Sequence, residues 1–158
     1  MEVGADRIGD EVLLHGRNGV AEPEAGRPVS QVEDDPALAR AKDAGIAVTV
    51  AIVDAGGHLV LLERMEGGKF HTAHSATTKA VCAASNKRST GAKGAVGQAL
   101  DLAHALGLAL AAGPERWTAM EGGAPIMVGG ECIGGVGVAG GNWEFDERVA
   151  QEAAESVK

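Results

Sequence analysis

Two histidines and a lysine in one Ala-rich segment are the residues of this sequence best suited to chemistry. His71 and His74 are three residues apart, so both imidazoles share a face if the segment is helical. Such a pair can hold a transition metal or flank a haem. Lys79 lies near Thr72 and Ser75, where an ammonium group beside hydroxyls can bind a carboxylate or a carbonyl. We therefore predict His71 and His74 as metal ligands or catalytic groups, and Lys79 as a ligand-binding or catalytic cation.

Acidic residues near the C-terminus are the second candidates. Glu144, Asp146 and Glu147 follow a Gly-Gly pair and fall in the first turn of an expected helix. Acidic residues there complement the helix dipole, which is a sufficient structural reason for them. If one of these carboxylates instead faces a pocket with His71 or His74, the two groups can act as base and acid. Asp146 and Glu147 are therefore the predicted catalytic partners of a histidine.

The order of apolar runs indicates the fold that must position these groups. Strands and helices do not alternate as in βαβ units, so we predict an α+β fold with helices packed on an antiparallel sheet. The Asp-Ala-Gly-Gly segment between the first two strands predicts a hairpin. In chain order, we expect a helix over 36–45, strands over 46–53 and 58–64, helices over 69–85 and 96–112, strands over 124–128 and 131–141, and a helix over 145–157.

The length of 158 residues suits one domain. Residues 1–32 are rich in Gly, Pro and acidic residues, and we interpret them as an N-terminal arm or an atypical lead-in. Residues 33–158 form the expected domain. Cys82 and Cys132 lie in apolar runs, which favours free thiols over a disulfide and indicates a reducing compartment.

The charge of the chain excludes some classes of partner. Against 14 Lys and Arg there are 22 Asp and Glu, a net charge of −8 that repels nucleic acids and acidic lipid surfaces. The sequence shows no secretory signal and no uninterrupted apolar run of about 18 residues, the length that spans a membrane. We therefore expect a cytoplasmic protein that binds neither nucleic acid nor membrane.

The glycine string GGECIGGVGVAGG invites comparison with a dinucleotide-binding fingerprint. That fingerprint needs a strand, a glycine turn and a helix that opens at once. Here the glycines lie within and around an expected strand. We interpret Gly134, Gly135 and Gly137 as positions that let a helix or a ligand approach the sheet closely.

Three segments together resemble one family: VDAGGHLVLLERMEGG, GGAPIMVGGECIGGVGVAGG and NWEFDERVAQEA. They are similar to the GlcG/HbpS-like group, also called the haem-degrading or PduO C-terminal-like domain, over residues 44–156. The resemblance implies a profilin-like α/β sandwich with a roughly five-stranded antiparallel sheet. It also implies dimers or higher homo-oligomers, and haem as a ligand with no other cofactor.

Family positions also supply candidate binding residues. We predict ligand binding by residues of two Gly-containing turns and by Lys79; these are Arg64, Met65, Gly67, Lys79, Gly140, Gly141, Trp143 and Glu144. The chain departs from the family at several positions, with Glu66 for Asp, Asn142 for Thr or Ser, and Phe145 for Gln. His71 and His74 stand where the family usually has other residues.

Three functional hypotheses remain open at this point. In the first, a pocket between the sheet and the helix over 70–85 binds haem or a similar small molecule, with Arg64 and Lys79 pairing with its carboxylates. In the second, the same residues form a cofactor-independent isomerase, cyclase or lyase that acts on a small carbonyl- or carboxylate-containing metabolite, for example in a biosynthetic pathway. In the third, the domain is an assembly or regulatory subunit without a ligand.

Overall fold

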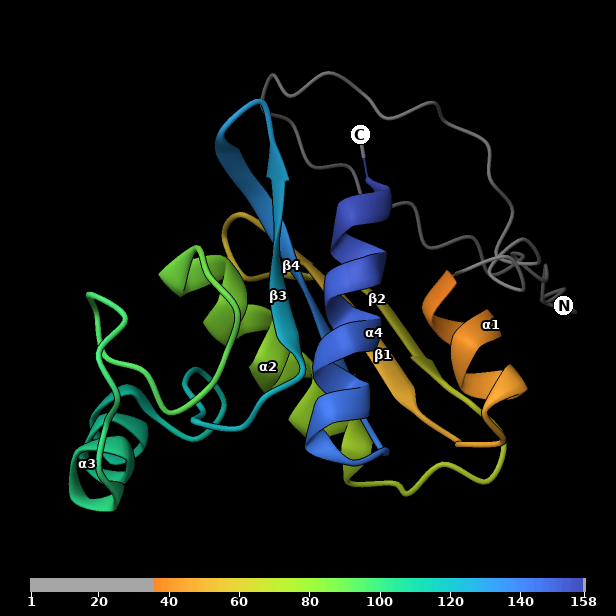
Figure 1. Ribbon diagram of the computed structural model, residues 1–158, viewed down its shortest axis with the longest axis horizontal. Coiled ribbons are helices and arrows are strands. Elements are labelled where there is room, and N and C mark those ends of the chain that lie inside the picture. The colour runs from red at the N-terminus through yellow and green to blue at the C-terminus, as the bar shows by residue number, and fades with distance from the viewer. Residues whose placement is uncertain (1–35, 158) are drawn as a thin grey trace, which may run out of the picture.

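The computed structural model describes residues 36–157, which form four helices and one four-stranded sheet (Figure 1). All neighbouring strands are antiparallel, and their order is β2-β1-β4-β3. The elements are α1 (Pro36–Asp43), β1 (Thr49–Asp54), β2 (Leu59–Arg64), α2 (Thr72–Asn86), α3 (Leu102–Ala112), β3 (Gly123–Val128), β4 (Glu131–Ala139) and α4 (Trp143–Ser156). The predicted α+β fold is confirmed. The roughly five strands implied by the family resemblance are corrected to four within the described residues, as the four strand ranges expected from the sequence indicate.

The hairpin between β1 and β2 forms as its turn residues predicted. Asp54 Oδ1 accepts hydrogen bonds from the backbone amides of Gly56, at 2.8 Å, and His58, at 2.9 Å. Gly57 supplies the positive φ of +80° that the turn requires. These hydrogen bonds lower the pKa of the Asp54 carboxyl, and the bond from the His58 amide has the largest effect.

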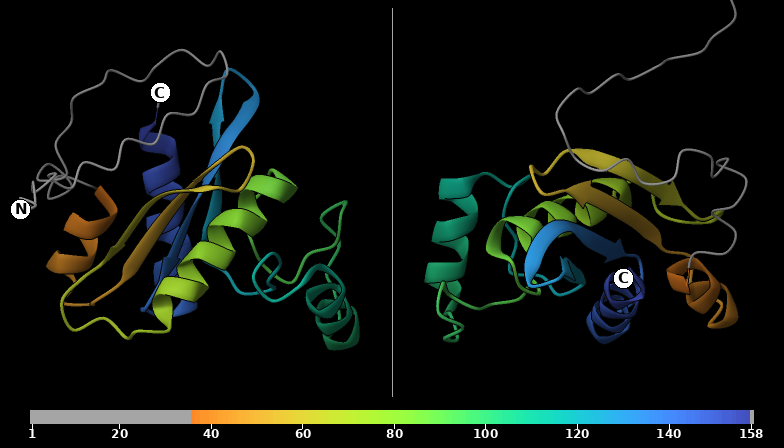
Figure 2. Two further views of the ribbon diagram at one scale, coloured as in Figure 1. Left: turned by 180° about the vertical axis from the view of Figure 1, so that it is seen from behind. Right: turned by 90° about the horizontal axis from the view of Figure 1, so that it is seen from above.

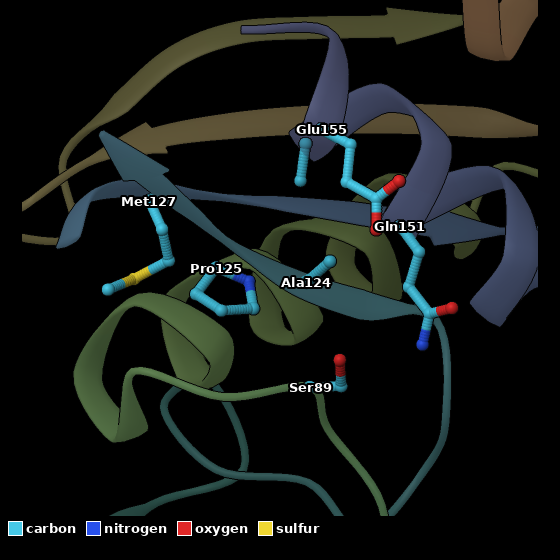
Figure 3. Close-up of a pocket in the computed structure, with 7 residues that line it drawn as sticks. Ser89, Ala124, Pro125, Met127, Gln151 and Glu155 are labelled. Carbon is cyan, nitrogen blue, oxygen red and sulfur yellow. The ribbon is translucent and has the colours of Figure 1, made fainter. Parts of the chain in front are cut away.

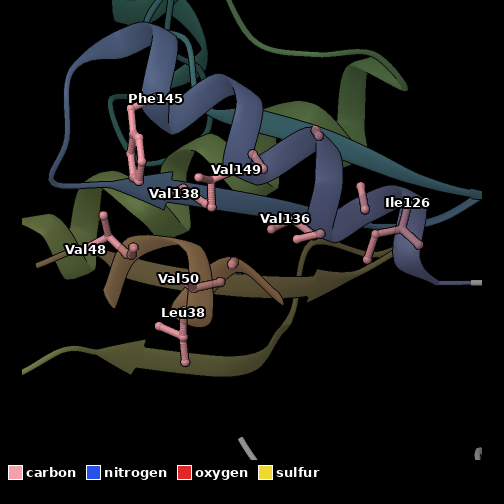
Figure 4. Packing of buried hydrophobic residues seen from close by; sticks show 14 residues of the cluster. Leu38, Val48, Val50, Ile126, Val136, Val138, Phe145 and Val149 are labelled. Atoms are coloured by element: carbon pink, nitrogen blue, oxygen red, sulfur yellow. The ribbon is translucent and has the colours of Figure 1, made fainter. Parts of the chain in front are cut away.

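Helices cover both faces of the sheet. The α2 helix crosses one face, while α1 and α4 cover the other (Figures 1 and 2). The larger core lies on the α4 side, where Phe145 and Val149 of α4 pack over Val136 and Val138 of β4 (Figure 4). Branched aliphatic and alanine side chains fill most of this core, as expected for a chain with 3% aromatic residues.

On its other face the sheet meets α2 backbone to backbone. A methyl group added at Gly137 would lie 1.9 Å from the Ala76 carbonyl oxygen, and one at Gly135 would lie 2.4 Å from that of Ala80. Both distances are far below van der Waals contact, so only glycine fits at these two positions. The interpretation that these positions allow close approach of a helix is confirmed for Gly135 and Gly137. It is wrong for Gly134, where an added methyl would instead lie 2.3 Å from the Val53 carbonyl oxygen of the neighbouring strand β1.

The α3 helix lies apart from the sheet (Figures 1 and 2). It begins at Leu102, later than the expected 96, because Asp101 caps it by accepting a hydrogen bond from the His104 amide at 2.9 Å. Its sequence, LAHALGLALAA, carries no Asp, Glu, Lys or Arg. Ala105 is nevertheless the residue of this helix that is buried.

The expected arm over residues 1–32 lies outside the described residues. Within 36–157, no helix has both the length and the apolar character needed to cross a bilayer. Both thiols are free, with Cys82 buried and Cys132 half-buried, as predicted. Burial raises the pKa of the Cys82 thiol.

Candidate functional site

Lys79 and Asp146 meet in a buried ion pair between α2 and α4. Lys79 Nζ lies 3.0 Å from Asp146 Oδ2 and donates a second hydrogen bond of 2.7 Å to the Val138 carbonyl oxygen. The other carboxylate oxygen, Asp146 Oδ1, accepts from the Gly141 amide at 2.9 Å. Both side chains are almost fully buried. This arrangement joins α2, the end of β4 and the first turn of α4.

The Lys79 ammonium group lies close to the backbone that leads into β3. Gly122, with φ of +104°, passes so close that an added methyl would lie 2.8 Å from Lys79 Nζ. A buried charge of this kind is tolerated only when it is paired and hydrogen-bonded, and here it is both. The ion pair gives Lys79 and Asp146 a structural role in joining α2 to α4, and their catalytic role stays a prediction.

The predicted residues of the segment after β2 build a turn. Arg64 is exposed, and its Nη1 donates to the Gly68 carbonyl oxygen at 3.0 Å. Met65 packs against the larger core, and Gly67 adopts a φ of +80°. Arg64 Nη1 is therefore partly used within its own loop, while the rest of its guanidinium stays at the surface.

The predicted residues around the start of α4 have mixed roles. Gly140 has a φ of +138°, and an added methyl there would lie 2.6 Å from the Ala47 carbonyl oxygen. Gly141 binds Asp146 as described above. Trp143 and Glu144 are exposed on the first turn of α4, and Glu147 is half-buried. The structure thus brings Lys79, Asp146 and Gly141 together, without either predicted histidine.

The two histidines lie in different surroundings. His71 precedes the first residue of α2, is exposed, and makes an edge-on contact with Phe70 at a ring-centroid distance of 5.9 Å. His74, one turn further, lines a cleft between α2 and α3. Within residues 36–157, no group of three or more His, Cys, Asp or Glu side chains is arranged to hold a metal ion.

The cleft beside His74 has a volume of about 430 Å³, within the range of small-molecule sites. Its walls come from α2, α3 and the segment that leads into β3. Most of the lining side chains are apolar: Leu102, Ala105, Leu106, Ala109, Pro114, Trp117, Ala119 and Met120. The polar ones are His74, Ser75, Thr78, Lys79 and Thr118. Between α2 and β4 the backbones meet closely at Gly135 and Gly137, whereas this cleft lies on the side of α2 that faces α3.

One stripe of α2 holds the far wall of the cleft in place. His74, Thr78 and Cys82 are spaced by four residues and so share a face of the helix. The Thr78 hydroxyl donates to the Pro114 carbonyl oxygen at 3.3 Å. The Cys82 thiol contacts the Thr118 carbonyl oxygen at 3.6 Å. Residues 114–118 are thereby fixed along α2, whereas α3 stands off and leaves the cleft open.

The composition of the cleft fits a planar, largely apolar group such as haem. Leucine, alanine and tryptophan side chains suit the faces of a macrocycle, and His74 offers the imidazole that most often binds haem iron. Of the predicted site residues, His74 and Lys79 line this cleft, and the ammonium group of Lys79 is already paired with Asp146.

A second hollow, of about 410 Å³, lies between β3 and the end of α4 (Figure 3). Pro125 and Met127 of β3 face Gln151 and Glu155 of α4 across it, with Ser89 at its side. None of the predicted site residues lines this hollow. The cleft between α2 and α3 is therefore the stronger candidate.

Sequence reasoning missed the wall of the cleft that faces His74. Leu102, Leu106, Trp117 and Met120 were not singled out, although a signal was present. A helix with four leucines and no charged residue, as here over 102–112, is expected to cover apolar surface. What the sequence does not show is that α3 covers α2 loosely.

Comparisons with known proteins identify similar chains. The sequence model of a family described as haem degrading protein HbpS-like matches residues 35–155. An uncharacterized 15.0 kDa protein of Citrobacter freundii, from the dhaT-dhaS intergenic region, is 30% identical over 116 residues, covering 73% of this chain and 79% of the relative.

Solved structures share the fold. Protein ORFY of Klebsiella pneumoniae superposes with a TM-score of 0.68 and 28% identity, covering 87% of this chain and 99% of the other. The crystal structure of a PduOC:heme complex superposes with a TM-score of 0.65 and 29% identity, covering 78% of this chain and 87% of the other.

Proposed function

Because the chain belongs to the HbpS-like family, as its sequence motifs predicted, we propose that it binds haem in the cleft between α2 and α3. The observation that carries this proposal is the position of His74, an imidazole on the wall of an apolar cleft of suitable size. The similarity to a protein crystallised with haem supports the choice of ligand.

The chemistry of the cleft supports binding through burial and coordination. Apolar walls remove the faces of a macrocycle from water, which contributes about 25 cal/mol for each Å² of apolar surface buried. His74 would add a bond to the iron and fix the orientation of the ring. Lys79 is not available to pair with a carboxylate of the ligand, because its ammonium group is already bound to Asp146 and Val138.

The same ion pair weighs against the enzymatic alternative. In that hypothesis Lys79 and Arg64 hold a carbonyl or carboxylate while His71 or His74 moves a proton, and Asp146 or Glu147 orients the histidine. Lys79 and Asp146 are the two of these groups that the ion pair uses. Both groups are occupied with each other, and neither contacts a histidine. Binding is therefore the better-supported function.

Assembly and location remain predictions. We propose a homo-oligomer, and its support in the structure is the exposed apolar surface of edge strand β2, where Leu59, Val60 and Leu62 are at least 42% exposed. The cytoplasmic location rests on the sequence alone.

Hemin titration of the purified chain tests the proposed function. The Soret band of hemin should shift and sharpen on addition of the wild-type protein, and saturate at one hemin per chain. His74→Ala should abolish or broaden the shift, whereas His71→Ala, a matched change three residues away and outside the cleft, should leave it unaltered. An unchanged hemin spectrum with the wild-type protein would refute haem binding, and equal spectra for His74→Ala and wild type would remove His74 from the site.

A further inference from the structure

We propose that residues 11–17 of this chain bind as an added strand along the open edge of β3, in the hollow between β3 and the end of α4. This inference does not depend on haem binding, because the hollow and the cleft between α2 and α3 share no lining residue. It concerns the predicted N-terminal arm, whose longest run of branched apolar residues is Val12, Leu13 and Leu14.

The backbone of β3 shows which of its groups point out of the sheet. The strand pairs with β4 on one side, and its other side is an edge of the sheet. At this edge the Gly123 amide donates to the Thr90 hydroxyl at 2.8 Å, and the Gly123 carbonyl oxygen accepts from the Thr90 amide at 2.9 Å. Backbone groups alternate in direction along an antiparallel strand, so those of Pro125 and Met127 point the same way. The register irregularity lies in β4, at Ile133, and leaves this alternation along β3 intact.

Beyond Thr90 the edge of β3 is open. Among residues 36–157, no backbone or side-chain group forms a hydrogen bond with the outward groups of Pro125 and Met127. Proline has no amide hydrogen, which is why it is tolerated on an edge strand. The groups available for pairing are therefore the Pro125 carbonyl oxygen and both the amide and the carbonyl oxygen of Met127. Such an edge is the surface to which an extended segment binds by strand addition.

The hollow beside this edge, of about 410 Å³, has the composition of a site for an apolar segment with a nearby cation. Ala124, Pro125, Met127 and Ala154 supply apolar surface, and Glu155 of α4 lies across from β3 (Figure 3). In the part of the chain that the structure describes, no Lys, Arg or His forms an ion pair with Glu155. The hollow thus joins unpaired strand groups, apolar side chains and a carboxylate without a cation.

Residues 11–17, EVLLHGR, match these three features. The segment contains no proline, so each of its amides can pair with a strand. Its apolar run is followed by His15 and Arg17, which complement the charge of Glu155. The other arginines of residues 1–35, Arg7 and Arg27, have no run of apolar residues beside them.

The chain is long enough to bring this segment to the hollow. Pro36 begins α1, and the ion pair of Arg40 with Glu152, at 3.2 Å, fixes α1 beside α4, the helix that forms one wall of the hollow. Residues 18–35 span up to about 60 Å when extended. A domain of this size has a radius of gyration of only about 14 Å. The segment can therefore reach β3 of its own chain without displacing α1.

Hydrogen exchange of backbone amides, followed by NMR on the isotopically labelled full-length chain, tests the proposal at the Met127 amide. This amide should exchange at least about tenfold more slowly in wild type than in Leu13→Asp, which removes an apolar contact of the segment. The matched change Val20→Asp, in the arm but outside the segment, should leave the rate as in wild type. Slow exchange of the Ala51 amide, in central strand β1, checks that each variant is folded.

A charge exchange tests the orientation of the segment. Arg17→Glu and Glu155→Lys should each speed exchange of the Met127 amide about two- to threefold at low salt, as expected for a surface ion pair. The double variant, with the charges exchanged, should return toward the wild-type rate. A double variant that exchanges faster than either single variant would remove this ion pair from the proposal.

Two results would overturn the proposal. Equal exchange rates of the Met127 amide in wild type and Leu13→Asp would show that the segment does not cover the edge of β3. Protection that rises with protein concentration would show that a second copy supplies the added strand, whereas docking within one chain predicts the same rate at every concentration. Both results leave the hemin titration unaffected, so this inference and the proposed function fail separately.

Discussion

The two sides of α2 differ in how they meet their neighbours. Toward the sheet, the helix backbone touches that of β4 at Gly135 and Gly137, and Lys79 is sealed in an ion pair with Asp146. Toward α3, the same helix borders a cleft of about 430 Å³ lined with leucine, tryptophan and methionine side chains. One helix thus has a closed side that stabilises the fold and an open side that can admit a ligand.

The same difference separates the predicted site residues. Lys79 and Gly141 both bind Asp146 on the closed side. His74 lies on the open side, on the wall of the cleft.

The largest expected effect is at the ion pair of the closed side. Lys79→Met leaves the Asp146 carboxylate buried without its cation, which should lower the free energy of unfolding by about 3–5 kcal/mol. Chemical denaturation measures the loss. The matched change Lys69→Met, at an exposed lysine, should stay within about 0.5 kcal/mol of wild type. Equal stabilities for the two variants would show that the pair does not stabilise the closed side.

The glycine contact of the closed side comes next. Gly137→Ala places a methyl 1.9 Å from the Ala76 carbonyl oxygen and should cost about 3 kcal/mol through displacement of α2. Gly107→Ala is the control, since no atom lies within 4 Å of an added methyl in α3. That change should stabilise the chain by about 0.5–1 kcal/mol through helix propensity. Thermal denaturation measures both changes. A shift of the melting temperature in the same direction for Gly137→Ala and Gly107→Ala would contradict this prediction.

An apolar residue on the open side should matter for binding and little for folding. Leu106→Ala removes part of the cleft wall from a side chain that is 54% exposed, so stability should change by no more than about 0.5 kcal/mol. Hemin affinity should fall about tenfold, equivalent to about 1.4 kcal/mol. Leu59→Ala, at a leucine that is 50% exposed on β2, should leave the hemin titration unaltered. Equal affinities for the two variants would place the ligand elsewhere.

The smallest expected effect is on the rate of chemical modification of Cys82, a buried thiol at the edge of the open side of α2. Burial raises the pKa of this thiol, so the folded chain holds less of the reactive thiolate at any pH below that pKa. Iodoacetamide should therefore modify Cys82 more slowly than the half-buried Cys132, with the sites separated by mass spectrometry. The difference should vanish in denaturant. Faster modification of Cys82 in the folded chain would mean that water reaches beneath the cleft.

Much of the fold followed from the sequence, because its signals are local. Asp54 and the glycines after it predicted the hairpin, and the glycines of β4 predicted the close approach of a helix to the sheet. The sequence could not show which side of the Ala-rich α2 would face the sheet, since alanine, threonine and serine occur all round it. For the same reason the sequence could not show that Lys79, predicted as a ligand-binding or catalytic cation, lies in a buried ion pair. Its partner, Asp146, is 67 residues away, and only tertiary packing brings the two together.

Amide chemical shifts of the isotopically labelled chain, with and without diamagnetic gallium protoporphyrin, test the central claim most directly. Ligand binding on the open side predicts that the largest shifts occur at His74, over residues 102–109 and over 114–120. Small shifts are expected at Arg64, Gly67, Gly140 and Glu144. The reverse pattern, with the largest shifts at those four residues and α3 unaffected, would contradict the account.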